Sequence, residues 1–151
     1  MKLIDMHCDT IWKLMDLGGE GDLMAGNCDV SIPGMRQAGT LAQFFACFGY
    51  LDDFKGRGGY DACYSHILEM ARYLKEQTCI HEDDIAMALS ADDIYRNEQK
   101  GKISAVLSVE EGGVLNGYID RLDTLYDNGV RLMTLLWNYE NCIGFPNSRD
   151  S

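Results

Sequence analysis

Two short groups of histidine and acidic side chains are candidates for chemistry. In the first, His7 and Asp9 flank Cys8 directly after the short apolar run of residues 2–6. In an extended chain, side chains two positions apart point to the same side, so His7 and Asp9 can converge on one point. One nitrogen and one oxygen ligand suit a divalent metal, zinc above all. In the alternative interpretation, His7 is a surface residue and Asp9 or Thr10 caps a following helix.

The second group is Glu110-Glu111, which follows an apolar segment at residues 102–109. Two carboxylates at a strand end are costly unless a cation meets them, and a metal held by His7 and Asp9 would do so. Neighbouring side chains on a strand point to opposite sides, so only one glutamate can share the face of His7 and Asp9. The alternative is that both carboxylates face water.

The composition excludes several classes of partner. The chain has 151 residues, a net charge of −11 and 46% hydrophobic residues, enough for one domain with a real core. Its acidity disfavours nucleic acid and anionic membrane surfaces. Met1 is followed almost directly by the first predicted strand, and no stretch approaches the length of a membrane span. We therefore expect a cytoplasmic protein, and its six cysteines, which form no C-x-x-C pair, are expected to be reduced.

Apolar runs and helical periodicities alternate along the chain. Strands are predicted at residues 2–6, 40–51, 85–89, 102–109 and 130–137, and helices at 10–17, 31–39, 60–78, 90–101 and 116–127. This alternation predicts a parallel sheet with right-handed crossovers. Both charged groups follow strands, and no G-x-G-x-x-G follows the first strand, so the pattern favours a TIM-type (β/α) barrel over a doubly wound sheet.

The charged strand ends resemble those of the renal (membrane) dipeptidase family. The resemblance is carried by His7-x-Asp9, by V-E-E-G-G at residues 109–113 and by L-Y-D-N-G-V-R-L-M-T-L at residues 125–135. Residues 27–39 and 42–46 extend it, so that it covers the whole chain. The family consists of binuclear zinc dipeptidases on a barrel of the metal-dependent amidohydrolase type. The resemblance therefore implies a (β/α)8 barrel, zinc and hydrolysis of dipeptides.

The resemblance also implies roles for particular residues. His7 and Asp9 would bind one zinc, and a glutamate would bridge two. A gap-free alignment of residues 125–131 with the family places Glu110 at the bridging position and Glu111 on a glycine, so we predict that Glu110 is the catalytic ligand. The same alignment places Trp137 where many members carry a histidine that contacts the substrate, and we predict that Trp137 and Asn138 line the substrate pocket.

Length separates this chain from the family. Members continue for about as many residues again and supply the other ligands of the second zinc, an arginine for the substrate carboxylate and an aspartate for proton transfer; none of these is in this sequence. A complete barrel needs roughly 200 residues or more. We therefore expect residues 1–151 to form the N-terminal portion of one barrel domain, as a truncated reading frame, a split gene or a shortened version of the enzyme.

Three hypotheses follow. The first is a zinc dipeptidase whose isolated N-terminal half is inactive or weakly active. The second is a non-catalytic half-barrel that self-associates or pairs with a missing C-terminal half. The third is another amidohydrolase, such as a deaminase or cyclic amidase, which is disfavoured because those enzymes typically carry H-x-H on the first strand, whereas here the second position is Asp9.

Overall fold

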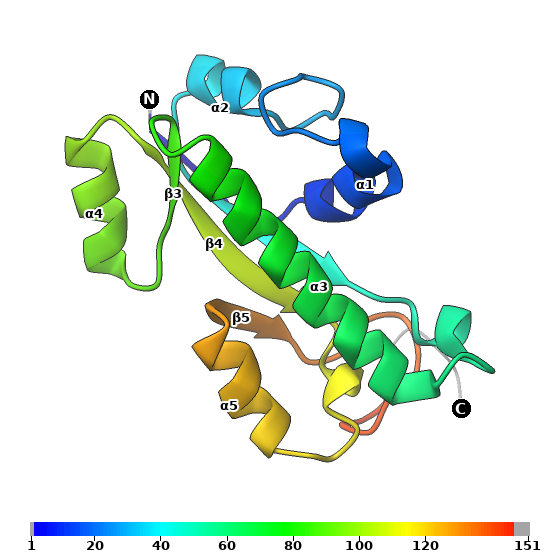
Figure 1. The fold of residues 1–151 in the computed structure, drawn as a ribbon. Helices are drawn as coiled ribbons and strands as arrows, with labels where there is room; N and C mark the ends of the chain where they lie inside the picture. The colour runs from blue at the N-terminus through cyan, green and yellow to red at the C-terminus, as the bar shows by residue number, and fades with distance from the viewer. Residues whose placement is uncertain (1, 147–151) are drawn as a thin grey trace.

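Five parallel strands form the centre of the molecule (Figure 1). The structure is a computed structural model and describes residues 2–146. The strands are β1 (Leu3–Asp5), β2 (Thr40–Phe48), β3 (Ile85–Met87), β4 (Ile103–Glu110) and β5 (Val130–Thr134). All pair in parallel, as the alternating pattern predicts.

The strand order is β1-β2-β4-β3, and β5 also pairs with β4. β2 pairs with one edge of β4, and the other edge is shared by two strands. β3 pairs with residues 103–105, and β5 pairs with residues 107–110, nearer the carboxyl end of β4. β1, β2, β4 and β5 therefore follow one another across the sheet as barrel strands would, with β3 as a short addition beside the start of β4.

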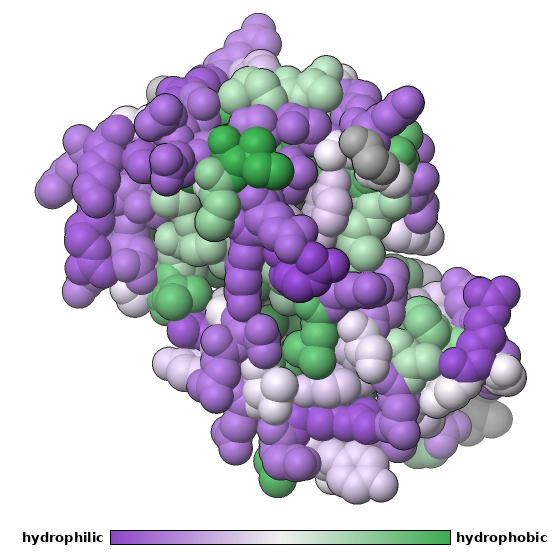
Figure 2. All heavy atoms as spheres, in the orientation of Figure 1, coloured by the Kyte–Doolittle hydropathy of each residue, from purple (hydrophilic) through white to green (hydrophobic). Residues whose placement is uncertain are grey.

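Five α-helices connect and cover the strands. They are α1 (Thr10–Asp16), α2 (Ile32–Ala38), α3 (Gly59–Ile80), α4 (Ala91–Gln99) and α5 (Asp120–Asp127). Short 3-10 turns lie at Gly18–Glu20, Leu51–Phe54 and Gly112–Leu115. The longest helix, α3, runs across the sheet (Figure 1). The face that carries α3 is mainly hydrophilic, and its apolar side chains form small separate patches (Figure 2).

The core lies between α3 and one face of the sheet. Alternate strand residues, including Phe45 and Leu107, are fully buried in one cluster with Ile67 and Met70 of α3. The cluster also takes buried residues from α1, α2 and α5. Because strand side chains alternate between faces, the even-numbered residues of β2 and β4 point to the opposite face, which would be the inside of a barrel. Phe48 and Glu110 are register partners on that inner face.

Helix caps are encoded locally, as the sequence indicates. The Ser31 side chain accepts a hydrogen bond from the backbone N–H of Gly34 at the start of α2, and Gly39 ends this helix with a φ of 71°. Ser90 caps α4 in the same way, accepting from the backbone N–H of Asp93. These positions fit the preference for serine at an N-cap and glycine after the last turn.

Three predicted elements are longer than those in the structure by three or four residues. The strand predicted at residues 40–51 ends at Phe48, and a 3-10 turn begins at Leu51. The helix predicted at residues 116–127 begins only at Asp120, because Asn116 (φ 48°) and Gly117 (φ 78°) both have positive φ and interrupt it. The strand predicted at residues 130–137 ends at Thr134, so Trp137 lies in the loop after β5. The apolar run continues to residue 137 although the strand does not. Apolar residues in a short run indicate burial in a loop as well as in a strand, and the pattern alone does not distinguish between them.

Candidate metal centre

His7, Asp9 and Glu110 converge beyond the carboxyl ends of β1 and β4. The His7 Nε2 atom lies 3.4 Å from Asp9 Oδ1 and 3.2 Å from Glu110 Oε2. One ligand atom from each residue lies within 4.8 Å of the others, and this is the only such group among residues 2–146. Ligand atoms about 2 Å from a zinc ion lie up to about 4 Å apart. The two distances from His7 fall within this limit, so His7 can share one cation with either carboxylate.

The backbone around Cys8 holds this group in place. Its N–H donates to the Phe44 carbonyl oxygen at 3.0 Å, and its own carbonyl oxygen accepts from the Ala46 N–H at 2.9 Å. These bonds continue the pairing of β1 with β2 past the end of β1, so residues 7–9 are fixed to a central strand. Asp9 occupies the N-cap position of α1, but its side chain makes no capping hydrogen bond. The alternative in which Asp9 serves as a side-chain cap is therefore wrong.

The electrostatics of the group favour a bound cation. The Glu110 side chain is only 17% exposed, and burial raises the pKa of this carboxyl above its ordinary value. The nearby His7 lowers the Glu110 pKa, whereas the charge of Asp9 raises it further. A divalent ion would remove the cost of two carboxylates placed side by side, and the donor set of one imidazole and two carboxylates is one that zinc accepts.

Glu111 points away from this group and is completely buried. One of its carboxylate oxygens, Oε2, accepts a hydrogen bond from Asn141 Nδ2, while Oε1 has no hydrogen-bond partner within residues 2–146. The backbone at Gly113 passes close by, and a Cβ atom there would lie 2.5 Å from Glu111 Oε1. Only Glu110 therefore shares the face of His7 and Asp9, as the alternation of strand side chains predicts.

An open cleft of about 440 Å³ contains the group. It is lined by His7, Asp9, Trp12, Phe48, Tyr50, Asp53, Glu110 and Trp137. Of the two residues expected to line a substrate pocket, Trp137 lines this cleft. Asn138 is exposed and does not line it. Trp12, Phe48 and Tyr50 were missed by sequence reasoning. The available signal was that Trp12 lies in the helix directly after the His7-x-Asp9 triplet and that Phe48 ends a predicted strand.

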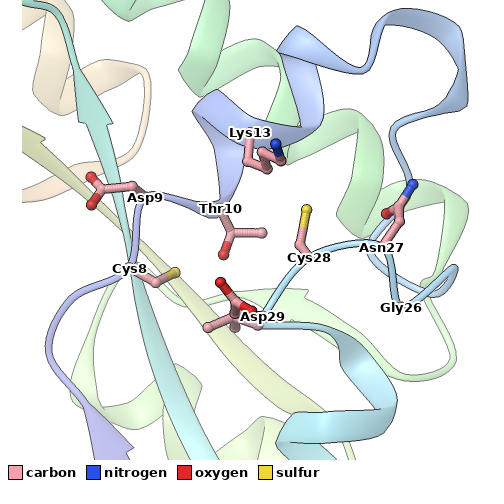
Figure 3. Close-up of a pocket in the computed structure, with 9 residues that line it drawn as sticks. Cys8, Asp9, Thr10, Lys13, Gly26, Asn27, Cys28 and Asp29 are labelled. Atoms are coloured by element: carbon pink, nitrogen blue, oxygen red, sulfur yellow. The ribbon is translucent and has the colours of Figure 1, made fainter.

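A larger cavity of about 690 Å³ lies on the other side of the first strand end. Cys8, Thr10, Cys28 and Asp29 point into this space, whereas the Asp9 carboxylate points away from it (Figure 3). Cys8 and Asp9 therefore diverge, as adjacent side chains of an extended segment do. Burial raises the pKa of the Cys8 thiol to about 11, so this thiol is protonated near neutral pH.

A parallel sheet with helices on one face and a His/Asp/Glu group at its carboxyl ends is typical of metal-dependent hydrolases on (β/α) barrels. Comparison with known proteins defines the family. A model of the membrane dipeptidase family, peptidase family M19, matches residues 1–148. The chain belongs to this family, and its fold is an alternating parallel β/α segment of the barrel found in amidohydrolase-type dipeptidases.

Three solved structures show the extent of the match. The dipeptidase AC, a metallo peptidase of family M19, is 16% identical to this chain, with a TM-score of 0.76. The match covers 89% of this chain and 44% of the dipeptidase. A metallo peptidase from Rhodobacter sphaeroides, bound to a phosphinate mimic of the dipeptide L-Ala-D-Ala, is 17% identical, with a TM-score of 0.73. The match covers 87% of this chain and 44% of that peptidase. An amidohydrolase from Pseudomonas aeruginosa is 14% identical, with a TM-score of 0.60. The match covers 74% of this chain and 31% of the amidohydrolase.

The chain therefore spans less than half the length of the solved relatives that it matches. Across residues 2–146, no helix has both the length and the apolar character needed to cross a bilayer.

Proposed function

We propose that this protein is a zinc-dependent dipeptidase and that residues 1–151 form the N-terminal portion of its single (β/α)8 barrel domain. The observation that carries the proposal is the convergence of His7, Asp9 and Glu110 at the carboxyl ends of the strands, where barrel enzymes keep their catalytic residues. Membership of the dipeptidase family supports the proposed reaction, and a donor set of one imidazole and two carboxylates supports zinc as the metal. A cytoplasmic location, expected from the sequence, is part of the same proposal.

The roles of the three side chains follow from their positions. His7 and Asp9 would hold one ion from a backbone fixed to β2, and Glu110 would reach the same ion from β4. Bound zinc would polarise the peptide carbonyl and lower the pKa of a water molecule toward neutrality. The resemblance to the family implies that Glu110 would serve a second ion as well, and its position on the inner face of the sheet is compatible with that role.

The second zinc of the family would need ligands that the described residues do not provide. Residues 2–146 hold only one group of three or more metal-binding side chains. No lysine or arginine of the described chain lines the cleft to receive a substrate carboxylate. We therefore expect the chain alone to hydrolyse dipeptides poorly or not at all, since a missing Lewis acid and a missing positioning group each raise the barrier by several kcal/mol.

The second candidate is a half-barrel that acts only with another chain. The observation in its favour is the row of exposed apolar side chains at the open edge of the sheet: Leu3 and Ile4 of β1 and, just beyond it, Met6. In this case the partner would supply the remaining ligands, or the assembly would have no catalytic role.

Hydrolysis of dipeptides tests the proposal. The chain is produced with an affinity tag in its native host, so that any segment or partner that completes the barrel copurifies. We expect release of free amino acids that is abolished by a chelator, restored by zinc and lost in His7→Ala. The matched control is His66→Ala, because His66 packs on Phe54 away from the centre. A zinc-saturated preparation that cleaves no dipeptide would favour the non-catalytic half-barrel.

A further inference from the structure

Four aromatic side chains form one continuous wall of the cleft that contains the candidate metal centre. The ring centroids of Trp12 and Phe48 are 6.0 Å apart, those of Phe48 and Trp137 are 5.1 Å apart, and those of Tyr50 and Trp137 are 6.1 Å apart. The rings come from α1, from the end of β2 and from the loop after β5. A wall of this kind offers a large apolar contact area next to the reacting atoms.

The loop that carries Trp137 is held in place. Asn141 Nδ2 donates to the Leu135 carbonyl oxygen at 3.0 Å and to the buried Glu111 carboxylate, and Asn141 Oδ1 accepts from the Ile143 N–H at 2.8 Å. One amide side chain thus ties both sides of the loop to the residue that follows Glu110.

Tyr139 supports the wall from the side. Its ring packs against Trp137 at 5.4 Å and against Tyr50 at 5.2 Å. A pocket whose shape is fixed in this way can discriminate between side chains, because little of the binding free energy is spent on ordering the loop.

The charges of the cleft decide which end of a dipeptide lies here. Its charged lining consists of the three candidate ligands and Asp53, and within residues 2–146 no lysine or arginine faces it. When a metal occupies the candidate ligands, Asp53 is the one further charged side chain among the described residues that line the cleft. A dipeptide carries an ammonium group on its first residue and a carboxylate on its second, so the acidic cleft favours the ammonium end.

We propose that this cleft receives the first residue of a dipeptide and selects a large apolar side chain at that position, with Trp137 as the main specificity-determining residue. The inference rests on the proposed dipeptidase function and extends it to a substrate class: dipeptides with an aromatic or large aliphatic amino-terminal residue. The volume of about 440 Å³ falls within the roughly 300–1,000 Å³ typical of small-molecule sites.

Intrinsic fluorescence offers a direct test, because the sequence has two tryptophans and both line the cleft. The metal-free chain is titrated with Phe-Gly, Gly-Phe and Gly-Gly, so that binding is measured without hydrolysis. We expect a saturable fluorescence change with Phe-Gly at concentrations at least about tenfold lower than with the other two dipeptides. Trp137→Ala should remove this preference, with Trp12 still reporting on the cleft, and Trp137→Phe should keep most of it.

Tyr95→Ala is the control, since Tyr95 is an exposed aromatic residue of α4 outside the cleft. Equal binding of Phe-Gly and Gly-Phe, no binding of either, or a preference that survives Trp137→Ala would overturn the proposal. Because the titration needs neither metal nor turnover, these results leave the hydrolysis assay of the dipeptidase proposal as a separate test.

Discussion

Glu110 and Glu111 are identical side chains on adjacent residues, yet their surroundings differ completely. Glu110 faces His7 across 3.2 Å in an open cleft, whereas Glu111 is buried against Asn141 on the other side of the chain. Burial raises the pKa of both carboxyls, but of the two only Glu110 has an imidazole of the described residues 2–146, that of His7, beside it. The two side chains therefore lie in separate surroundings, Glu110 beside His7 in the cleft and Glu111 against Asn141 of the loop after β5.

Asp93 supplies a prediction about a single charge. It accepts hydrogen bonds from the Leu89 N–H and the Ser90 hydroxyl and pairs with Arg96, and these contacts lower its pKa to about 2 from the ordinary 3.8. Because the folded-state pKa is depressed, the stabilisation is present above pH 3.8 and is lost as the pH falls through about 2.

We expect Asp93→Asn to lower the free energy of unfolding by about 0.5–1 kcal/mol at pH 6, a value limited by solvent screening of an exposed pair. The difference from wild type should shrink as the pH falls below 3.8. Urea denaturation at several pH values measures it, with Asp92→Asn as the control. An equal effect of both substitutions would show that the hydrogen bonds and the ion pair of Asp93 do not stabilise the fold.

At the scale of elements, short sequence patterns predict the helices and strands whose positions depend on nearby residues alone. The strands at β2 and β4 and the helix α3 follow from apolar runs and periodicity, and α2 and α4 begin at the serine caps that the sequence indicates. The shared edge of β4 does not follow from such signals. Whether β3 or β5 pairs beside β4 depends on tertiary packing, which no short sequence pattern records.

The candidate site divides in the same way. His7 and Asp9 are brought together by alternation within one segment, and Glu110 joins them because parallel strands end at the same edge of a sheet. The aromatic wall combines Trp12, Phe48, Tyr50 and Trp137, which come from three segments that are far apart in the sequence. Only the resemblance to the dipeptidase family pointed to Trp137, and Asn138, predicted beside it, is exposed and does not line the cleft.

At the scale of the whole molecule, the described chain is an open part of a barrel. Within residues 2–146, β1 pairs only with β2 and β5 only with β4, so both end strands have an edge that no described residue pairs with. Ile4 is 48% exposed and Leu135, just after β5, is 57% exposed. Free strand edges with exposed apolar side chains favour pairing with another chain.

We therefore expect the isolated chain to form a dimer or a larger species at micromolar concentration, measured by light scattering. Ile4→Lys combined with Leu135→Lys should shift it toward the monomer, because the charges make edge pairing costly. The control is Ile80→Lys, since Ile80 is exposed at the end of α3 rather than at a sheet edge. A wild-type chain that is monomeric at this concentration would contradict the open-barrel account.

Zinc binding by the chain alone tests the central claim most directly. Three protein ligands with water as the fourth are the set that a catalytic zinc uses, so equilibrium dialysis followed by metal analysis should find about one zinc per chain. His7→Ala and Glu110→Gln should abolish this binding, and Glu111→Gln, the matched control, should retain it. A wild-type chain that binds no zinc, or zinc that is retained in Glu110→Gln and lost in Glu111→Gln, would contradict the account.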